Sequence, residues 1–542
     1  MNVPSTPNLA PELLRDMVNK ASPGPNYITH AVQPPTGLNI PAWERYRHIF
    51  EHSDYSLLDQ LKWGFPTGVP SGAILSVPFT NHSSARKHPD IVESYINKHL
   101  HTKALYGPYS ANPLDVDIIV SPLQVAFSSS GKPRVCNDLS FGDCSVNNAI
   151  SADWSQYPGF AGEFSLPTAD DLVDAILQVG PGALLWKTDF AAYYKQLCSD
   201  PAQVATLAFA FDDHIYFESR LPFGLRSSCL NAQRVTRAVI LIYNTKTKSF
   251  AVGYVDDVIG CSPAISAFMD YDSFCALSDE LGLGRTLDKC VAPTYRVVWI
   301  GLQFDTIAME ISLPPEKRDR IIAALQAWLL KPSGSKTALQ SLLGTLNHAA
   351  SVVVIGRAFT GRILDIINQD SFPAPLDSEF KKDIEFWLSF LQDSKLCRAA
   401  FKSRHTIPCD SFVQIAVLGP KFAIAHDNNV GFFEVGDDFE CNHPLVFVYA
   451  VWMASMMLAS VATGKWITFL VPTQIDVHTI NRARPVSPRL RPMVRQTWWV
   501  QATHDFVLRA KKGLCDREID QMLNDCPDCT SVSLKTVPEY FC

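Results

Sequence analysis

Apolar and polar positions along the chain separate segments that favour strands from segments that favour helices. Two apolar runs, Phe250–Val252 and Val258–Gly260, flank the tetrapeptide YVDD at 254–257 and predict two short strands joined by a tight turn. A longer apolar run at 183–190 predicts a buried strand with an acid, Asp189, near its end. The pattern therefore places acidic side chains at the ends of buried strands.

Helical and strand patterns alternate through the rest of the chain. Apolar residues spaced three and four apart predict helices at 88–99, 169–180 and 265–281, a helix that opens at Arg226 after a Pro-Phe-Gly turn, and a mainly helical region from Pro314 to about Leu391. Strand patterns at 121–140 and 290–305 predict hairpins. The segment from about 406 to 525 is strand-rich at first and then helical.

A chain of 542 residues is too long for a single core, so several domains are expected. The fold class that these patterns favour is α+β and multidomain. We expect a partly irregular, Pro-rich N-terminal region at 1–100 and folded segments at 101–310, 311–405 and 406–525, followed by a tail at 526–542.

Asp256 and Asp257 are adjacent at the tip of an apolar hairpin, where two carboxylates repel each other and lose water. Such a pair requires a compensating cation, and divalent metal ions are the usual one. Asp189 precedes Asp256 by 67 residues and supplies a third carboxylate, enough for a two-metal clamp. Alone, Asp189 would equally suit a helix N-cap, and DD pairs are common.

Composition limits the class of protein. Apolar residues make up 47% of the chain and charged residues 19%, as in folded soluble proteins, and the net charge is −7. A whole-chain basic excess, the usual footprint of a nucleic-acid binder, is therefore missing. Local basic patches and bound metal can still supply the field that nucleic acid needs.

Cysteine usage and the N-terminus predict an intracellular protein with reduced thiols, without distinguishing nucleus from cytoplasm. One C-x-x-C pair, Cys526 and Cys529, lies between Cys515 and Cys542, which is weak evidence for zinc. The stretch 445–462 carries no charge over 18 residues. No basic cluster flanks it and no second such stretch exists, so a buried helix is favoured over a membrane span.

Six segments resemble reverse transcriptases, in the family's order and across roughly 200 residues. GKPRVCNDLS resembles the fingers strand, KTDFAAYYKQL the palm motif with the first catalytic acid, and LPFGLRSS the start of the template-side helix. YVDD resembles the catalytic hairpin, LDKC the lysine motif that follows, and WIGLQFD the hairpin before the thumb. The resemblance implies a right-hand polymerase, with fingers and palm at 101–310 and a helical thumb or connection at 311–405.

Further segments are similar to tyrosine-recombinase retrotransposons of the DIRS type. They are SVNNAIS, LPFGLRSS and SLLGTLNHAASVVVIGRAFTGRILDII, and the resemblance covers about residues 85–525. It implies an RNA-directed DNA polymerase that uses an RNA template, a DNA primer and dNTPs, with a tyrosine recombinase encoded separately as a partner. No recombinase or methyltransferase segment is visible in the sequence.

The resemblance assigns roles to the three acids. Asp189, Asp256 and Asp257 would hold two Mg²⁺ (or Mn²⁺) ions in the palm, with Asp189 and Asp256 as shared ligands and Asp257 nearer the primer end. Lys289 resembles the lysine that protonates pyrophosphate. The chemistry implied is in-line phosphoryl transfer, which depends on positioning and charge neutralisation.

The nucleotide pocket follows from the same resemblance. Arg134 would meet the triphosphate, Tyr194 would exclude a ribose 2′-hydroxyl, and Phe223 and Gly224 would border the pocket.

Two departures affect this assignment. Three serines at 128–130 replace the family's lysine-rich turn and leave Lys132 as the nearest cation. Tyr193 fills a place that is usually small, so either Tyr193 or Tyr194 is the sugar gate.

The segment 406–525 resembles ribonuclease H, a fold that needs four carboxylates around two metals. Asp427 and Asp520 occupy the first and fourth acid positions, whereas Phe447 and Pro472 stand at the second and third. We therefore expect a vestigial ribonuclease H-like domain that folds without cleaving RNA, with 445–462 as its core helix.

An arginine-rich segment inside this domain would suit a nucleic-acid backbone, although a solvated loop and helix face explains it equally well. The arginines concerned are Arg482, Arg484, Arg489, Arg491 and Arg495.

Two functions compete. The first is an RNA-directed DNA polymerase with a degenerate ribonuclease H domain. The alternative is a catalytically decayed or domesticated retroelement-derived protein that binds nucleic acid or a protein partner. The three intact acids favour the first, and the acidic charge, the serine turn and the missing ribonuclease H acids favour the second.

Overall fold

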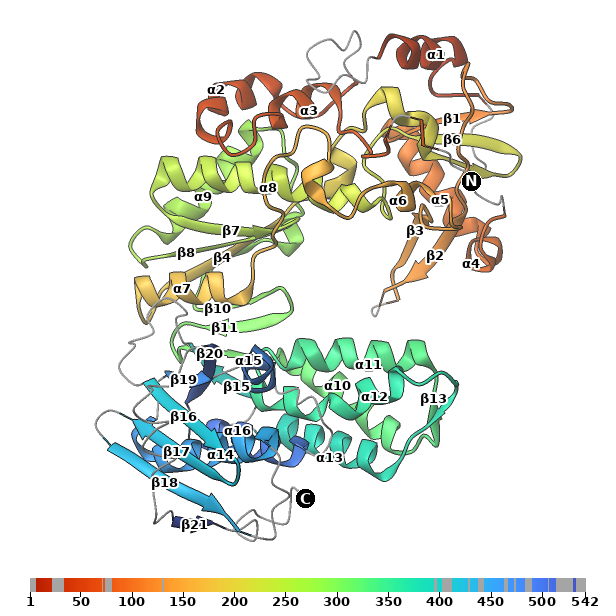
Figure 1. Cartoon of the computed structure of the whole chain (residues 1–542). Coiled ribbons are helices and arrows are strands. Elements are labelled where there is room, and N and C mark those ends of the chain that lie inside the picture. The colour runs from red at the N-terminus through yellow and green to blue at the C-terminus, as the bar shows by residue number, and fades with distance from the viewer. Residues whose placement is uncertain are drawn as a thin grey trace. The chain divides into compact units, whose positions relative to one another are not determined.

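The computed structural model divides into two compact units, Met1–Ile300 and Gly301–Cys542, which we describe separately (Figure 1). The division lies close to the predicted boundary at 310. The residues described are 6–21, 34–70, 72–73, 80–128, 131–393, 397–401, 412–426, 429–436, 443–462, 466–471, 474–482, 490–504, 506–512 and 530–532.

The first unit is built around an antiparallel sheet of four strands in the order β7-β8-β4-β9. Two long helices, α8 (Arg226–Thr247) and α9 (Ala267–Glu280), pack on this sheet (Figure 1). The strands are β4 (Leu184–Asp189), β7 (Phe250–Tyr254), β8 (Asp257–Ser262) and β9 (Val291–Thr294). The predicted buried strand, the YVDD hairpin and both helices are confirmed.

Residues 290–305 differ from the single hairpin that their pattern predicts. They form β9, β10 (Arg296–Trp299) and β11 (Leu302–Asp305), and β9 pairs with β4. Apolar alternation identifies a strand but does not identify its partner, because pairing across a long sequence separation leaves no local signal.

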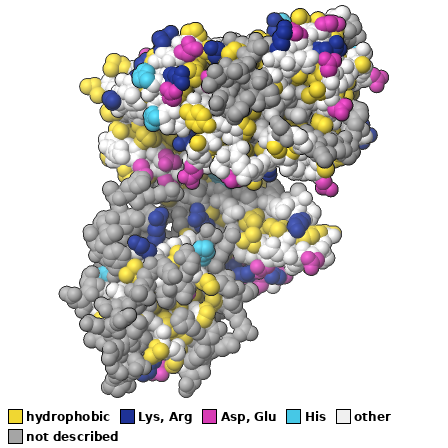
Figure 2. All heavy atoms as spheres, turned by 45° about the horizontal axis from the view of Figure 1, so that its top comes forward, with side chains coloured by type: hydrophobic (Ala, Val, Ile, Leu, Met, Phe, Trp, Pro, Cys, Tyr) yellow, Lys and Arg dark blue, Asp and Glu magenta, His cyan; other side chains and the backbone are white. Residues whose placement is uncertain are grey.

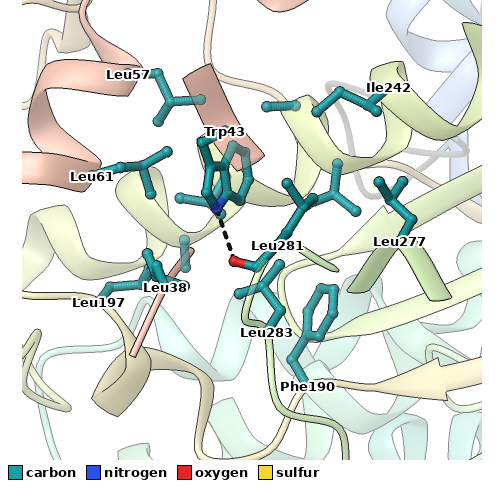
Figure 3. Close-up of a cluster of buried hydrophobic side chains, with 14 of the residues drawn as sticks. Leu38, Trp43, Leu57, Leu61, Phe190, Leu197, Ile242, Leu277, Leu281 and Leu283 are labelled. Carbon is teal, nitrogen blue, oxygen red and sulfur yellow. Dashed lines mark hydrogen bonds between the residues drawn. The ribbon is translucent and has the colours of Figure 1, made fainter. Parts of the chain in front are cut away.

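The core beneath the sheet includes residues that the sequence assigned to an irregular N-terminal region. Helices α2 (Ile40–Phe50) and α3 (Leu57–Trp63) pack against α8, and Trp43 is fully buried. The Trp43 indole donates a hydrogen bond to the Leu281 carbonyl at 3.1 Å, and Phe190 joins the same cluster directly after β4 (Figure 3). This part of the region 1–100 thus belongs to the core that supports Asp189.

The remainder of the first unit contains a three-stranded antiparallel sheet and a separate hairpin. The sheet has the order β1-β6-β5, and the hairpin joins β2 to β3 as predicted. The strands are β1 (Leu105–Tyr109), β2 (Leu123–Phe127), β3 (Pro133–Asn137), β5 (Ala208–Phe211) and β6 (His214–Glu218). The helices around them are α1 (Pro11–Lys20), α4 (Ser83–Lys87), α5 (Pro89–His101), α6 (Val146–Ala149) and α7 (Ala169–Val179).

The second unit begins with the predicted helical region, which is broken into separate helices. Prolines and capping residues set the breaks: the Ser335 hydroxyl caps α11 and the Asp377 carboxylate caps α13. The elements are α10 (Pro315–Leu329), α11 (Lys336–Ala349), the 3-10 helix η5 (Val354–Phe359), α12 (Gly361–Ile367) and α13 (Ser378–Gln392). Short strands β12 (Glu310–Ser312), β13 (Ser333–Gly334), β14 (Ala374–Pro375) and β15 (Arg398–Ala400) lie between them.

A mixed six-stranded sheet follows, in the order β20-β19-β16-β17-β18-β21. The first three strands in the sequence are antiparallel neighbours, whereas β19 runs parallel to β16, β20 parallel to β19 and β21 parallel to β18. The strands are β16 (Phe412–Leu418), β17 (Lys421–His426), β18 (Asn429–Val435), β19 (Trp466–Val471), β20 (Val507–Lys512) and β21 (Thr530–Val532). The helices are α14 (His443–Ala462), α15 (Gln474–Arg482) and α16 (Arg491–Thr503).

The uncharged stretch forms α14, which packs against β16, β17 and α16. Phe447 on α14 is fully buried. Across the described residues, no helix combines the length and the hydrophobicity that crossing a membrane requires.

The predicted boundary at 405/406 does not separate two compact bodies. Helix α16 packs against η5, and Arg495 forms an ion pair with the buried Asp383 of α13. Arg491 likewise pairs with Asp365 at 2.6 Å. These contacts join the helical region and the mixed sheet in one unit.

Candidate active site

The YVDD turn joins β7 to β8 with a strained backbone. Tyr254 pairs with Asp257 across the hairpin, so that Val255 and Asp256 form a two-residue turn. Val255 has φ of +54°, a value that β-branched residues rarely adopt and that costs about 1–3 kcal/mol. Surrounding bonds must therefore hold this turn in place.

Side chains of α8 provide those bonds. The Val255 amide donates to Gln233 Oε1 at 2.7 Å, and the Val255 carbonyl accepts from Thr236 Oγ1 at 2.5 Å. Gln233 Nε2 donates to the Gly253 carbonyl at 2.8 Å. A Cβ at Gly253 would lie 2.3 Å from Thr236 Cγ2, so glycine at this position allows the close approach of α8 to β7.

The register of β4 and β8 brings Asp189 to the same edge of the sheet. Asp189 lies directly opposite Asp257 in the antiparallel pair, so their side chains share one face. The Phe190 amide donates to the Asp256 carbonyl at 2.9 Å and ties the end of β4 to the turn. The structure thus brings together the three acids that the sequence selected.

Two lysines lie against these acids. Lys289 Nζ is 3.0 Å from both carboxylate oxygens of Asp189, and Lys187 Nζ is 3.0 Å from Asp257 Oδ1. Lys289 was predicted, whereas the sequence gave no reason to single out Lys187, which reads as the interior of a strand. The signal that could have found it is its place two residues before Asp189, on the same face of the strand.

Burial and mutual repulsion shape the charge of the site. Burial raises the pKa of Asp257 to about 6, despite the opposing effect of the Lys187 ammonium. Burial also raises the pKa of Asp256, and the negative charge of Asp189 adds to the shift. The hydrogen bond to Asp189 raises the pKa of Lys289, so this lysine stays charged at neutral pH.

Oxygen ligands from three carboxylates are the donor set that Mg²⁺ and Mn²⁺ prefer. The raised pKa values of Asp256 and Asp257 mean that their anionic forms are undercompensated, as expected where a cation is to bind. The residues therefore fit a divalent cation by chemistry. Among the described residues, no three His, Cys, Asp or Glu side chains already converge as a metal-binding group, because Lys289 and Lys187 hold Asp189 and Asp257.

The cost of burying Asp257 predicts a stability change. Asp257→Asn should stabilise the metal-free protein at pH 7.5 by about 2–3 kcal/mol, because a carboxyl with a folded pKa near 6 and an unfolded pKa near 3.8 disfavours folding once it is ionised. Ionisation in the unfolded state sets in above pH 4, so the gain should disappear as pH falls to 4.

Thermal or urea unfolding in EDTA at both pH values measures this difference. Asp213→Asn, an exposed acid in the β5–β6 turn, is the matched control and should change stability little at either pH. Equal effects of the two substitutions at pH 7.5 would contradict the prediction.

Tyr193 and Tyr194 occupy different environments. Tyr193 is buried, and its hydroxyl lies 2.9 Å from Thr236 Oγ1 and donates to the Ala232 carbonyl at 3.2 Å. Tyr194 is only partly buried, and its ring lies 5.0 Å from that of the exposed Phe223. Tyr193 thus supports the turn from within the core, and Tyr194 is the tyrosine that reaches the surface beside Phe223.

The Pro-Phe-Gly turn is held by Asn147 of the SVNNAIS segment. Asn147 Nδ2 donates to the Gly224 carbonyl at 2.6 Å, and Asn147 Oδ1 accepts from the Arg226 amide at 2.7 Å. Gly224 has φ of +103°, and a Cβ there would lie 2.6 Å from the Asn137 carbonyl oxygen, so only glycine fits. The start of α8 is fixed by these contacts.

The remaining predicted residues lie elsewhere. Lys132 and Arg134 are exposed on the β2–β3 hairpin, and no ion pair among the described residues joins them to the three acids. Arg491 and Arg495 are engaged in the ion pairs with Asp365 and Asp383. The structure does not describe Asp427, Asp520, Pro472, Arg484, Arg489, the side chain of Arg482, or the cysteines at 515, 526, 529 and 542.

Charged side chains of both signs are interspersed over the described surface seen in Figure 2. This distribution agrees with the net charge of −7. A positive surface for nucleic acid on this face would therefore have to be local.

Comparison with solved structures identifies the fold. A foamy viral protease-reverse transcriptase dRH in complex with double-stranded DNA has a TM-score of 0.50 at 14% identity, with 95% of this chain and 84% of that chain covered. The foamy viral protease-reverse transcriptase in complex with an RNA/DNA hybrid has a TM-score of 0.49 at 13% identity, covering 98% and 66%. The sequence matches no protein-family model and no curated protein. The chain therefore has a reverse transcriptase-like fold.

Proposed function

We propose that the protein is an RNA-directed DNA polymerase that adds nucleotides from dNTPs to a primer 3′-hydroxyl. The observation that carries the proposal is the placement of Asp189 opposite Asp257, with Asp256 in the turn between β7 and β8, inside a reverse transcriptase-like fold. The complexes of the foamy viral enzyme with DNA and with an RNA/DNA hybrid support nucleic acid as the partner class.

Asp189, Asp256 and Asp257 would hold two Mg²⁺ or Mn²⁺ ions, which when bound neutralise charge on the reacting phosphate. The other groups act directly. Lys289 is charged and lies at the mouth of the acid cluster, where its ammonium can give a proton to departing pyrophosphate. The bonds from Gln233 and Thr236 fix the turn, so the acids need little rearrangement during the reaction.

The segments at 101–310 and 311–405 would be the fingers with palm and the thumb or connection. On this assignment Arg134 and Lys132 would reach the triphosphate from the fingers hairpin. The SVNNAIS and LPFGLRSS segments favour a DIRS-type element, whose separately encoded tyrosine recombinase would be a partner.

The mixed sheet of the second unit would be a ribonuclease H-like domain without nuclease activity. Its strand order and directions support the domain type, and the fully buried Phe447 supports the loss of the second acid. We expect no cleavage of the RNA strand of an RNA–DNA hybrid in Mg²⁺ or Mn²⁺. Cleavage by the purified chain would contradict this part of the proposal.

Tyr194 rather than Tyr193 should be the sugar gate, because only Tyr194 is partly exposed beside Phe223. Tyr194→Ala is expected to lower the preference for dNTP over rNTP, measured as the ratio of kcat/KM, by about tenfold or more. Tyr193→Phe should leave the ratio unchanged and cost about 1 kcal/mol of stability, because it removes buried hydrogen bonds. A changed ratio in Tyr193→Phe alone would reverse the assignment.

A second candidate function is binding of nucleic acid or protein without polymerisation. The ion pairs that Lys187 and Lys289 make with two of the three acids favour it, since they balance charge without metal. Magnesium-dependent dNTP incorporation on a primed RNA template separates the two candidates. Incorporation that Asp256→Asn abolishes supports the polymerase, and no incorporation by folded protein that binds the primed template supports the alternative.

A further inference from the structure

Lys187 differs from the other lysine of the site in how firmly it is held. It extends from the middle of β4, its side chain is 19% exposed, and its ammonium bridges Asp257 Oδ1 at 3.0 Å and the Val298 carbonyl of β10 at 3.3 Å. Lys289 lies in the short 3-10 helix η4 (Leu287–Lys289) with 57% of its side chain exposed. Lys187 is therefore a fixed cation, whereas Lys289 has room to move.

Asp257 is bound to β10 through both its side chain and its backbone. The Lys187 ammonium connects its carboxylate to Val298, and the Trp299 indole donates to the Asp257 carbonyl at 3.0 Å. Trp299 is fully buried, so this strand is a rigid support. The orientation of the Asp257 carboxylate is thus set by β4 and β10 together, before any cation binds.

We propose that Lys187 is a positioning residue that occupies Asp257 in the substrate-free protein and weakens cation binding there. A fixed positive charge next to a carboxylate repels a divalent cation at that carboxylate. Asp189 and Asp256 then provide the first cation position, and Asp257 becomes a full ligand only when bound substrate adds negative charge. This inference rests on the proposed polymerase function and assigns Lys187 the role of ordering metal binding within it.

The inference makes a prediction that a purely structural role does not. Lys187→Met keeps the length of the side chain and removes its charge, so substrate-free protein should bind Mn²⁺ about tenfold more tightly or better. Lys187→Arg keeps the charge and should bind Mn²⁺ like the wild type. In primer extension, Lys187→Met should lower kcat with little change in the KM for dNTP, because Asp257 loses its support.

Electron paramagnetic resonance of free and bound Mn²⁺ measures the affinity without any catalytic turnover. Lys246→Met, on a lysine whose ammonium binds the Tyr46 hydroxyl at 2.6 Å, is the matched control and should leave Mn²⁺ affinity unchanged. Lys187→Gln is a second neutral variant that replaces Lys187→Met if the latter fails to fold.

Unchanged or weaker Mn²⁺ binding in the neutral Lys187 variants overturns the inference. If the wild type binds Mn²⁺ and extends primers in that case, the proposed function stands and only the role of Lys187 falls. If neither the wild type nor a neutral variant binds Mn²⁺ and no primer is extended, both the inference and the proposed function fail.

Discussion

Asp256→Asn is expected to reduce template-directed dNTP incorporation by at least about a thousandfold, because it removes a charge that acts where the reacting phosphate is neutralised. Asp189→Asn should have a loss of similar size, since Asp189 lies opposite Asp257 and beside the turn. Burial raises the pKa of Asp256, so the neutral asparagine should fold at least as well as the aspartate. A quenched single-turnover primer extension measures the loss.

The control for this experiment is Asp213→Asn, which makes the same chemical change at an exposed turn outside the site. It should retain wild-type incorporation. Melting temperatures of all variants at or above that of the wild type show that the loss is not one of folding. Activity of Asp256→Asn within tenfold of the wild type would remove this residue from the proposed site.

Arg234→Met is expected to have the largest effect on stability, about 3–5 kcal/mol, because it leaves a carboxylate unpaired inside the protein. Arg234 is 3% exposed and binds Asp54 through two parallel hydrogen bonds of 2.7 and 2.8 Å. Its remaining donors reach Gln60, Ser56 and Asn231. This single side chain thereby connects the start of α3 to α8, the helix that holds the YVDD turn.

Arg237→Met is the matched control on the same helix, because the exposed Arg237 makes one hydrogen bond of 3.0 Å to the Glu163 carbonyl. It should change stability by less than about 0.5–1 kcal/mol. Urea unfolding followed by tryptophan fluorescence measures both variants, and the first transition is compared because the chain has two compact units. Equal midpoints for Arg234→Met and Arg237→Met would contradict the structural role given to Arg234.

The three acids could be selected from the sequence because each lies next to an apolar run whose pattern identifies a strand. Their convergence depends on the pairing of β4 with β8, and the chain gives no local sign of that register. The same holds for Gln233 and Thr236, which read as ordinary residues of a helix until the helix is placed against the turn. The resemblance to reverse transcriptases supplied the long-range information that local patterns lack.

The N-terminal region shows a different limit. Proline-rich pieces around 34–41 and 66–78 predicted irregular structure, yet Trp43 and Leu57 lie in the core beneath Asp189. Prolines mark the ends of α2 and its neighbours but do not reveal that an apolar face between them is buried. Arg491 and Arg495 illustrate the opposite error, since a run of arginines suggests a binding surface although these two pair with buried or half-buried acids of the same unit.

Extension of a DNA primer on an RNA template by the purified wild-type chain is the most direct test of the central claim. With Mg²⁺ and one dNTP at a time, the account predicts addition of the nucleotide complementary to the template base, and loss of that addition in EDTA and in Asp256→Asn. Folded protein that binds the primed template in Mg²⁺ or Mn²⁺ but adds no nucleotide would contradict the account.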